Sequence, residues 1–276
     1  MKKIKYILFA VLSVIFISSC VKENRINCPC YLLFAHDGFD NNEYFGDINL
    51  FIYEDGHKLD DSVYDIVEMI EDKCDIPVKR GYHDVCGVGG IKYMDIDRTY
   101  SLRIPYGYQC DPIYAFHDDV TAQGERALVF GTIHKQYATV YLNVNITADN
   151  EAAVKVIGNT SGLDIRTMEP LDGEFCCLVK KDLDGYFSFR VPRQRNSSLD
   201  IEVWDTPVGS NPSISTMIGC SKLTSLNIGS IISDRLQYDW NASSLPDIYI
   251  DVDFVRSMMT ITIKEWGIDE VLTLDV

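Results

Sequence analysis

The chain has 276 residues, a formal net charge of −16 and 46% hydrophobic residues, a composition typical of a globular protein rather than a disordered one. The excess of carboxylates argues against nucleic-acid binding, because a phosphate backbone requires a basic surface. It also argues against a polybasic attachment to anionic lipid. Nine cysteines are too few for a disulfide-dense miniprotein but many for a reduced cytosolic protein.

The first 19 residues have the pattern of a signal peptide. Three lysines precede an almost wholly apolar run over residues 6–17, which is too short to span a bilayer comfortably. The run ends in Ile17-Ser18-Ser19-Cys20, which resembles the lipobox of bacterial lipoproteins, where cleavage falls before a cysteine that carries a diacylglycerol. We therefore expect lipidation of Cys20, and a tether over residues 20–27. The alternative is a secretory peptide that happens to have a cysteine near its cleavage site.

Lipidation would fix the location of the protein without any help from charge. Two or three acyl chains hold a protein on a membrane almost permanently. Lys22 and Glu23, just after the cysteine, resemble the surface-export signal of Bacteroidales lipoproteins, although a simple polar tether would look the same. The expected location is the outer face of an outer membrane. Without the first 19 residues, which include three lysines and no acid, the net charge is −19.

The rest of the chain reads as β-structure in chain order. Apolar, β-branched and aromatic runs of five to eight residues recur between Gly, Asp, Asn and Pro. Val140, Leu142 and Val144 alternate with polar residues, which is the period of a half-buried strand. Asp55-Gly56 is a hairpin-turn signal. The predicted strands are residues 30–34, 48–53, 100–104, 113–117, 127–130, 138–146, 152–157, 175–179, 186–191, 199–204, 214–218, 248–254, 259–263 and 271–276.

Two helices are also predicted, over residues 62–73, where Ser62 is the candidate N-cap, and over residues 223–231. So many strands and so few helices favour an all-β fold of two stacked β-sandwiches with a minor helix. We place the N-terminal sandwich at residues 28–133 and the C-terminal sandwich at residues 134–276.

Several motifs, in order along the chain, resemble the FimB-type or Mfa-like fimbrial anchor subunits of Bacteroidales type V pili. The lipobox cysteine is followed by Asn27-Cys28-Pro29, and a later strand ends in Pro105-Tyr106-Gly107. The remaining matching pieces are Ile48-Asn49-Leu50-Phe51-Ile52-Tyr53-Glu54-Asp55-Gly56 and Ile261-Thr262-Ile263-Lys264-Glu265-Trp266.

The resemblance implies two transthyretin-like β-sandwich domains, a position at the base of a fimbrium, and partners that are pilin subunits bound by donor-strand exchange. In such an exchange, a strand of one subunit completes the sheet of its neighbour. Because the N-terminal strand near residues 30–34 is joined to the lipid through Cys20, we expect this strand to stay in place. Whether the C-terminal segment is a donor strand or packs in its own domain is left open.

No pattern in the sequence predicts catalysis or a cofactor. The five histidines are not paired at metal-ligand spacing, and His83-x-x-Cys86 lacks a second pair of ligands. Asp182-x-Asp184-Gly185 begins like a calcium loop but lacks its closing glutamate, so a solvated turn is favoured. No nucleophile elbow, phosphate loop or metalloprotease signature is present.

Two further alternatives concern the cysteines and the aromatic residues. Eight cysteines besides Cys20 could form disulfides in an exported protein or remain buried free thiols. Trp204, Trp240 and Trp266, with sixteen tyrosines, could form a carbohydrate-binding face, so a surface glycan-binding lipoprotein is the rival function. Aromatic residues in β-sandwiches more often belong to the core.

Overall fold

The computed structural model describes residues 28–35, 46–70, 75–97, 100–145, 151–182, 185–207, 209, 213–215, 217, 219–253, 255–265 and 268–275. The predicted signal peptide, Cys20 and the tether lie outside the described residues. Strands dominate the described residues, and helices are confined to α2 and α3. The predicted all-β fold of β-sandwiches with a minor helix is confirmed.

The N-terminal sandwich consists of two sheets. Sheet A has the strand order β4-β1-β9, and sheet B has the order β10-β8-β5-β2-β3. Apolar residues of both sheets, among them Leu32, Leu50 and Phe116, form one core between them. The elements are β1 (Cys30–Phe34), β2 (Asp47–Glu54), β3 (His57–Asp65), α2 (Ile66–Ile70), β4 (Ile76–Val78), β5 (Gly81–Gly89), β8 (Tyr114–Ala122), β9 (Arg126–Val129) and β10 (His134–Lys135).

The C-terminal sandwich also has two sheets. Sheet D has the order β14-β11-β17-β18-β19, and sheet C has the order β16-β15-β12-β7-β6, with β13 on the other side of β12. The elements are β6 (Asp95–Ile96), β7 (Ser101–Arg103), β11 (Tyr137–Asn145), β12 (Glu151–Asp164), β13 (Pro170–Lys180), β14 (Phe187–Pro192), β15 (Asp200–Thr206), β16 (Ser221–Asn227), α3 (Ile228–Leu236), β17 (Asp247–Asp253), β18 (Met258–Glu265) and β19 (Ile268–Asp275).

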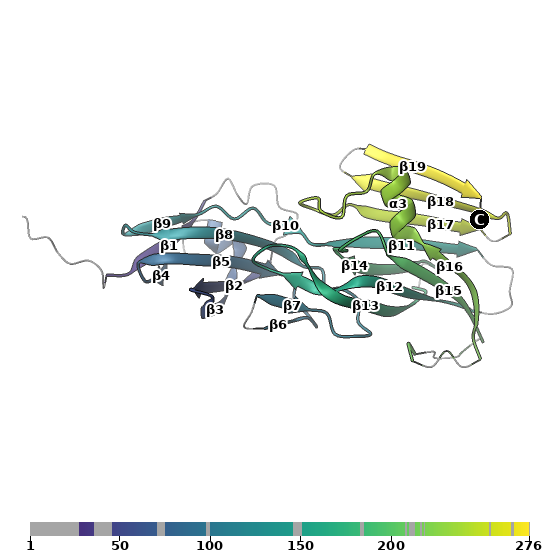
Figure 1. Cartoon of the computed structure of the whole chain (residues 1–276), viewed down its shortest axis with the longest axis horizontal. Coiled ribbons are helices and arrows are strands. Elements are labelled where there is room, and N and C mark those ends of the chain that lie inside the picture. The colour runs from purple at the N-terminus through teal and green to yellow at the C-terminus, as the bar shows by residue number, and fades with distance from the viewer. Residues whose placement is uncertain are drawn as a thin grey trace, which may run out of the picture.

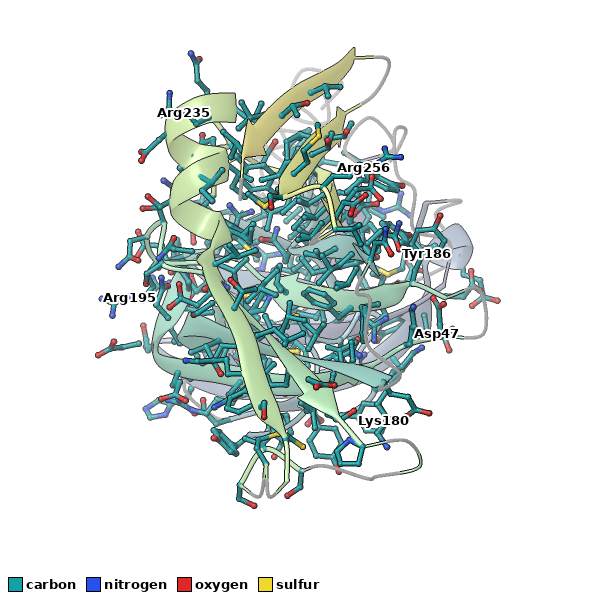
Figure 2. All side chains as sticks on the ribbon, turned by 90° about the vertical axis from the view of Figure 1, so that its right-hand side faces the viewer. Asp47, Lys180, Tyr186, Arg195, Arg235 and Arg256 are labelled. Atoms are coloured by element: carbon teal, nitrogen blue, oxygen red, sulfur yellow. The ribbon has the colours of Figure 1, made fainter. Side chains whose placement is uncertain are left out.

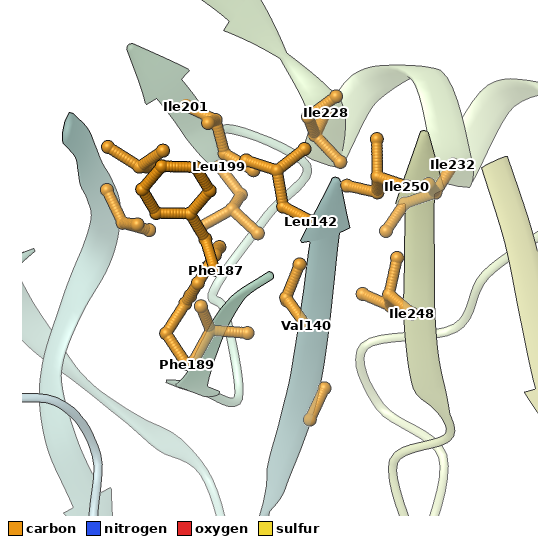
Figure 3. Packing of buried hydrophobic residues seen from close by; sticks show 14 of the residues in the cluster. Val140, Leu142, Phe187, Phe189, Leu199, Ile201, Ile228, Ile232, Ile248 and Ile250 are labelled. Atoms are coloured by element: carbon orange, nitrogen blue, oxygen red, sulfur yellow. The ribbon is translucent and has the colours of Figure 1, made fainter. Parts of the chain in front are cut away.

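The core of this sandwich follows the alternation that the sequence shows. Val140, Leu142 and Val144 are buried on one face of β11, as expected from the pattern. They pack with residues of β14, β15 and β17, such as Phe187, and α3 closes the core with Ile232 (Figure 3). Viewed along the long axis, α3 lies along one side of the sheets, with Arg235 directed outward (Figure 2).

The two sandwiches follow one another along the long axis of the molecule (Figure 1). A third core joins them, because the face of sheet B that points away from sheet A packs against β7 and the end of β12. Tyr53 and Cys86 of sheet B, Leu102 of β7 and Leu163 of β12 are buried together there. Sheet B is therefore the middle layer, with apolar contacts on both of its faces.

The pairing of β7 with β12 crosses the expected boundary between residues 133 and 134. Leu102 is opposite Leu163 in an antiparallel register. A segment of the first half therefore belongs to a sheet of the second half. The boundaries 28–133 and 134–276 stay a prediction for how the chain divides into units.

Both predicted helices are wrong at their starts. Residues 62–65 belong to β3, which pairs with β2 from Asp47 to Glu54, and only Ile66–Ile70 is helical before the described range ends. Residues 223–227 belong to β16, and α3 begins at Ile228, where the side chain of Asn227 accepts a hydrogen bond from the amide of Ser230 at 2.7 Å. Strand pairing outweighed the local amphipathic pattern in both places.

Other local predictions also have clear outcomes. Asp55 and Gly56 form the turn between β2 and β3 with φ values of 51° and 76°, as expected for a hairpin turn of the primed kind. The predicted strand over residues 214–218 is wrong, because 214, 215 and 217 are not in a strand. Among the described residues, no helix is long and apolar enough to cross a membrane.

Gly162 tests the importance of the β7–β12 contact. It has a φ of 153°, and a Cβ there would lie 2.0 Å from the carbonyl oxygen of Leu102. Gly162→Ala should therefore separate the two strands and lower the free energy of unfolding by at least about 3 kcal/mol. Gly124→Ala is the control, since its Cβ would meet no atom closer than 3.4 Å. Equal stability of the two variants in urea unfolding would contradict the prediction.

Candidate functional site

The N-terminal strand lies in the centre of sheet A. β1 pairs antiparallel with β4 on one side and parallel with β9 on the other. Cys30, Leu32 and Phe34 are buried between the two sheets. The strand that follows the expected lipid attachment site is thus an integral part of the first core.

The chain is fixed where it enters this strand. Arg80 donates from Nε to the carbonyl oxygen of Cys28 at 3.3 Å and from Nη1 to that of Gln123 at 2.8 Å. The amide of Tyr31 donates to the carbonyl oxygen of Glu125 at 2.9 Å. These bonds connect the start of β1 to the loop between β8 and β9.

The C-terminal segment packs in its own sheet. β19 pairs antiparallel with β18 from Ile268 to Asp275. It is the last strand of sheet D, and such edges can accept a further strand. The question that the sequence left open is answered for residues 268–275, which belong to the C-terminal sandwich.

No disulfide joins any two of the described cysteines. Cys28 is exposed and Cys220 is partly exposed. The other five are buried: Cys30, Cys86, Cys110, Cys176 and Cys177. Burial raises the pKa of the Cys30, Cys86, Cys110, Cys176 and Cys177 thiols, which makes them poor nucleophiles. Of the two alternatives, the five buried cysteines fit that of small apolar core residues.

A polar cluster lies on the face of sheet B that meets the second sandwich. Asp84 on β5 is opposite Asp119 on β8, and His117 lies on the same face two positions away. Nε2 of His117 is 3.7 Å from Oδ1 of Asp84 and 3.4 Å from Oδ1 of Asp119. The three ligand-type atoms lie within 4.8 Å of one another.

Groups from elsewhere in the chain form ion pairs and hydrogen bonds with the two carboxylates of the cluster. Nε of Arg166, in the turn after β12, is 3.4 Å from Oδ1 of buried Asp84. The hydroxyl of Tyr100 donates to Oδ2 of Asp84 at 2.7 Å. The hydroxyl of Tyr82 donates to Asp119 at 2.5 Å, which holds the pKa of Asp119 below its usual value and contributes to raising that of Tyr82 to about 12.

These groups can hold a divalent cation in principle, since one imidazole and two carboxylates are common ligands. However, both carboxylates already have partners within the chain, because Arg166 lies beside Asp84 and the Tyr82 hydroxyl donates to Asp119. The arrangement fits a polar contact between the two sandwiches. The sequence did not point to it, because Asp84, the pair His117 and Asp119, and Arg166 come from three separate segments, and His83-x-x-Cys86 contains only Asp84 of these residues.

Exposed tyrosines gather on the segment between β5 and β8. The rings of Tyr93 and Tyr108 are 62% and 50% exposed, with centroids 5.4 Å apart. Oδ2 of the buried Asp111 accepts the amides of Lys92, Tyr93 and Met94 at 2.7, 2.7 and 2.8 Å. The carboxylate thus fixes the backbone that presents Tyr93.

The two described tryptophans do not support the alternative of a carbohydrate-binding face. Trp240 is buried in the core of the C-terminal sandwich. Trp204 is half-buried and donates to Glu202 on its own strand at 3.1 Å. Trp266 lies outside the described residues. Asp182 accepts the amide of Tyr186 at 2.8 Å, as expected of a turn residue.

Comparison with known proteins gives a fold but no sequence family. No protein-family model matches the chain, and no curated protein matches it significantly. Solved structures do match. The fimbrial anchor protein Mfa2 from Porphyromonas gingivalis has a TM-score of 0.55 at 12% identity, with 87% of this chain and 98% of that chain covered.

Two structures from Bacteroides thetaiotaomicron are similar to the same extent. A candidate polysaccharide-binding protein has a TM-score of 0.58 at 10% identity, over 90% of this chain and 98% of that one. A candidate adhesin has a TM-score of 0.56 at 10% identity, over 85% and 96%. The resemblance to the Mfa-like fimbrial proteins is confirmed at the level of the fold.

Asp84 is expected to stabilise the junction. Asp84→Ala leaves the Tyr100 hydroxyl and Arg166 without their acceptor, and should lower the free energy of unfolding by about 1–3 kcal/mol. Asp172→Ala removes an exposed ion pair with Arg195 and should cost at most about 1 kcal/mol. Urea unfolding of both variants measures the difference. A loss for Asp84→Ala no greater than for Asp172→Ala would show that the cluster adds nothing.

Proposed function

We propose that this chain is a lipid-anchored subunit of a fimbrium, located at its base, which tethers the fimbrium to the outer membrane through Cys20 and limits its length. The observation that carries the proposal is the central position of β1 in sheet A. The fold shared with the Mfa2 anchor protein supports it. No enzymatic activity is part of the proposal.

A central β1 makes the tether end of the molecule unsuitable for polymerisation. Removing the strand would take Cys30, Leu32 and Phe34 out of the first core and detach the protein from its lipid. A sandwich that keeps its N-terminal strand has no vacant position there for the strand of another subunit. Growth of the fimbrium can therefore proceed only away from the membrane.

The partner is then a pilin subunit that binds the C-terminal sandwich by β-augmentation. This sandwich lies at the opposite end of the molecule from sheet A (Figure 1). Sheet D ends in β19 there, and an edge strand can hydrogen-bond to an incoming strand. Partner and membrane thus occupy opposite ends.

Replacing Cys20 tests the anchor directly. In a strain that makes only the Cys20→Ala chain, labelled fatty acid should no longer be incorporated into the protein, and fimbriae should be shed into the medium. The physical reason is the loss of acyl chains, each methylene of which contributes about 0.8 kcal/mol to membrane binding. Metabolic labelling and electron microscopy of the cell surface give the readouts.

Cys28→Ala is the matched control, because Cys28 is an exposed cysteine close to Cys20 in sequence. It should leave labelling and attachment unchanged. Label that persists in the Cys20→Ala chain contradicts the lipid anchor. Attached fimbriae of normal length after deletion of the whole gene contradict the role at the base.

Binding of a surface glycan is the second candidate function. It is favoured by the exposed pair Tyr93 and Tyr108 on a backbone fixed by Asp111, since aromatic rings stack on sugar rings. The fold shared with a candidate polysaccharide-binding protein agrees with it. Under this alternative the lipid anchor is retained and the fimbrial partner is absent.

A glycan array separates the two functions. If the chain binds glycan through this pair, the double variant Tyr93→Ala/Tyr108→Ala should lose at least about tenfold in affinity, which corresponds to about 1.4 kcal/mol. Tyr186→Ala, at another exposed tyrosine, should bind as the parent chain does. If the parent chain binds no glycan, this candidate is rejected.

A further inference from the structure

The outer face of sheet A is apolar and exposed. It consists of Tyr31 and Leu33 on β1, Pro77 on β4, Leu128 on β9, and Phe130 just after β9. Leu128 and Phe130 are 53% and 63% exposed. Leu33 is directly opposite Leu128 in the parallel register of β1 and β9, so the side chains of the two strands form one surface.

Such a surface is unusual for a solvated sheet. A sheet with one solvated face usually alternates apolar residues toward the core with polar residues toward water, whereas the β1 and β9 strands of sheet A have apolar residues on both faces. The strands β1, β4 and β9 contain no carboxylate, although the chain has 41 acidic residues. Their one charged side chain is Arg126, next to Tyr31 in the register.

The tether places this face close to the expected lipid. Arg80 holds Cys28 beside the loop between β8 and β9, so the chain leaves the body at sheet A. Seven residues lie between Cys20 and Cys28, and the eight steps along the chain span at most about 28 Å when fully extended. The expected lipid attachment site at Cys20 and the outer face of sheet A therefore lie close to each other.

We propose that the outer face of sheet A lies against the lipid surface that holds Cys20. Tyr31 and Phe130 enter the headgroup region, where aromatic side chains are favoured, and Arg126 pairs with lipid phosphate. The body is then held in one orientation rather than swinging on a flexible tether. This inference rests on the proposed lipidation of Cys20.

Hydroxyl-radical footprinting of the purified acylated chain tests the contact. The chain is reconstituted at low density in vesicles of phosphatidylethanolamine and phosphatidylglycerol, and compared with the processed Cys20→Ala chain in solution. Oxidation of Tyr31, Leu128 and Phe130 should be at least about fivefold slower on the vesicles. Val63 and Val271, exposed elsewhere, should be oxidised equally in both samples.

A double variant, and vesicles that carry the protein at several densities, distinguish a lipid contact from contact with a second copy of the chain. Leu128→Glu/Phe130→Glu should abolish the protection of Tyr31, and Val63→Glu, which places one carboxylate at a similarly exposed position away from this face, should not. Equal oxidation of Tyr31 on vesicles and in solution overturns the proposal. Protection that rises with protein density also overturns it, in favour of a second copy of the chain on this face.

The N-terminal peptide is analysed separately by mass spectrometry, so failure of lipidation is distinguished from failure of the contact. If Cys20 is not acylated, the contact is judged by flotation of the processed chain with the same vesicles. The parent chain and Val63→Glu should then float, and Leu128→Glu/Phe130→Glu should not. A parent chain that does not float overturns the proposal.

Discussion

The insertion of β1 between β4 and β9 is the constraint on which the rest of the structure depends. Without it, β4 and β9 have no common neighbour, and sheet A does not exist as a sheet. Without sheet A, the apolar face of sheet B that contains Leu50 and Phe116 has nothing to pack against. The strand closest in sequence to Cys20 is thus also the strand that completes the first core, so the proposed lipid anchor would couple membrane attachment to folding.

Sheet B connects the first core to the second half of the molecule. Its other face forms the shared core with β7 and the end of β12, and the Asp84 cluster lies at the edge of that contact. A core of this kind makes the two sandwiches one continuous body, because separating them would expose residues such as Leu102 and Leu163. A force applied at the far end of the C-terminal sandwich therefore reaches β1, as the proposed role at the base of a fimbrium requires.

Strands with a clean alternation could be predicted from the sequence, and those without it could not. Val140, Leu142 and Val144 mark β11 because a half-buried strand repeats every two residues. β5 was missed, since it is buried on both faces and shows no alternation. Ser62 and Val63 read as the start of a helix but pair with β2, a contact with residues that a local pattern does not include. Asp84, His117 and Asp119 were missed for the same reason.

By itself, the sequence determined the Asp55-Gly56 turn and the all-β character of the body, which depend on neighbouring residues, and it predicted a signal peptide and a lipid site at Cys20. Only the tertiary structure decided that β1 is central, that β7 crosses into the second sandwich, and that Asp111 fixes the backbone of Tyr93. The physical reason is that sheet order and side-chain clusters come from pairings between distant segments. Burial and hydrogen bonding select such pairings over the whole chain, and no local pattern encodes them.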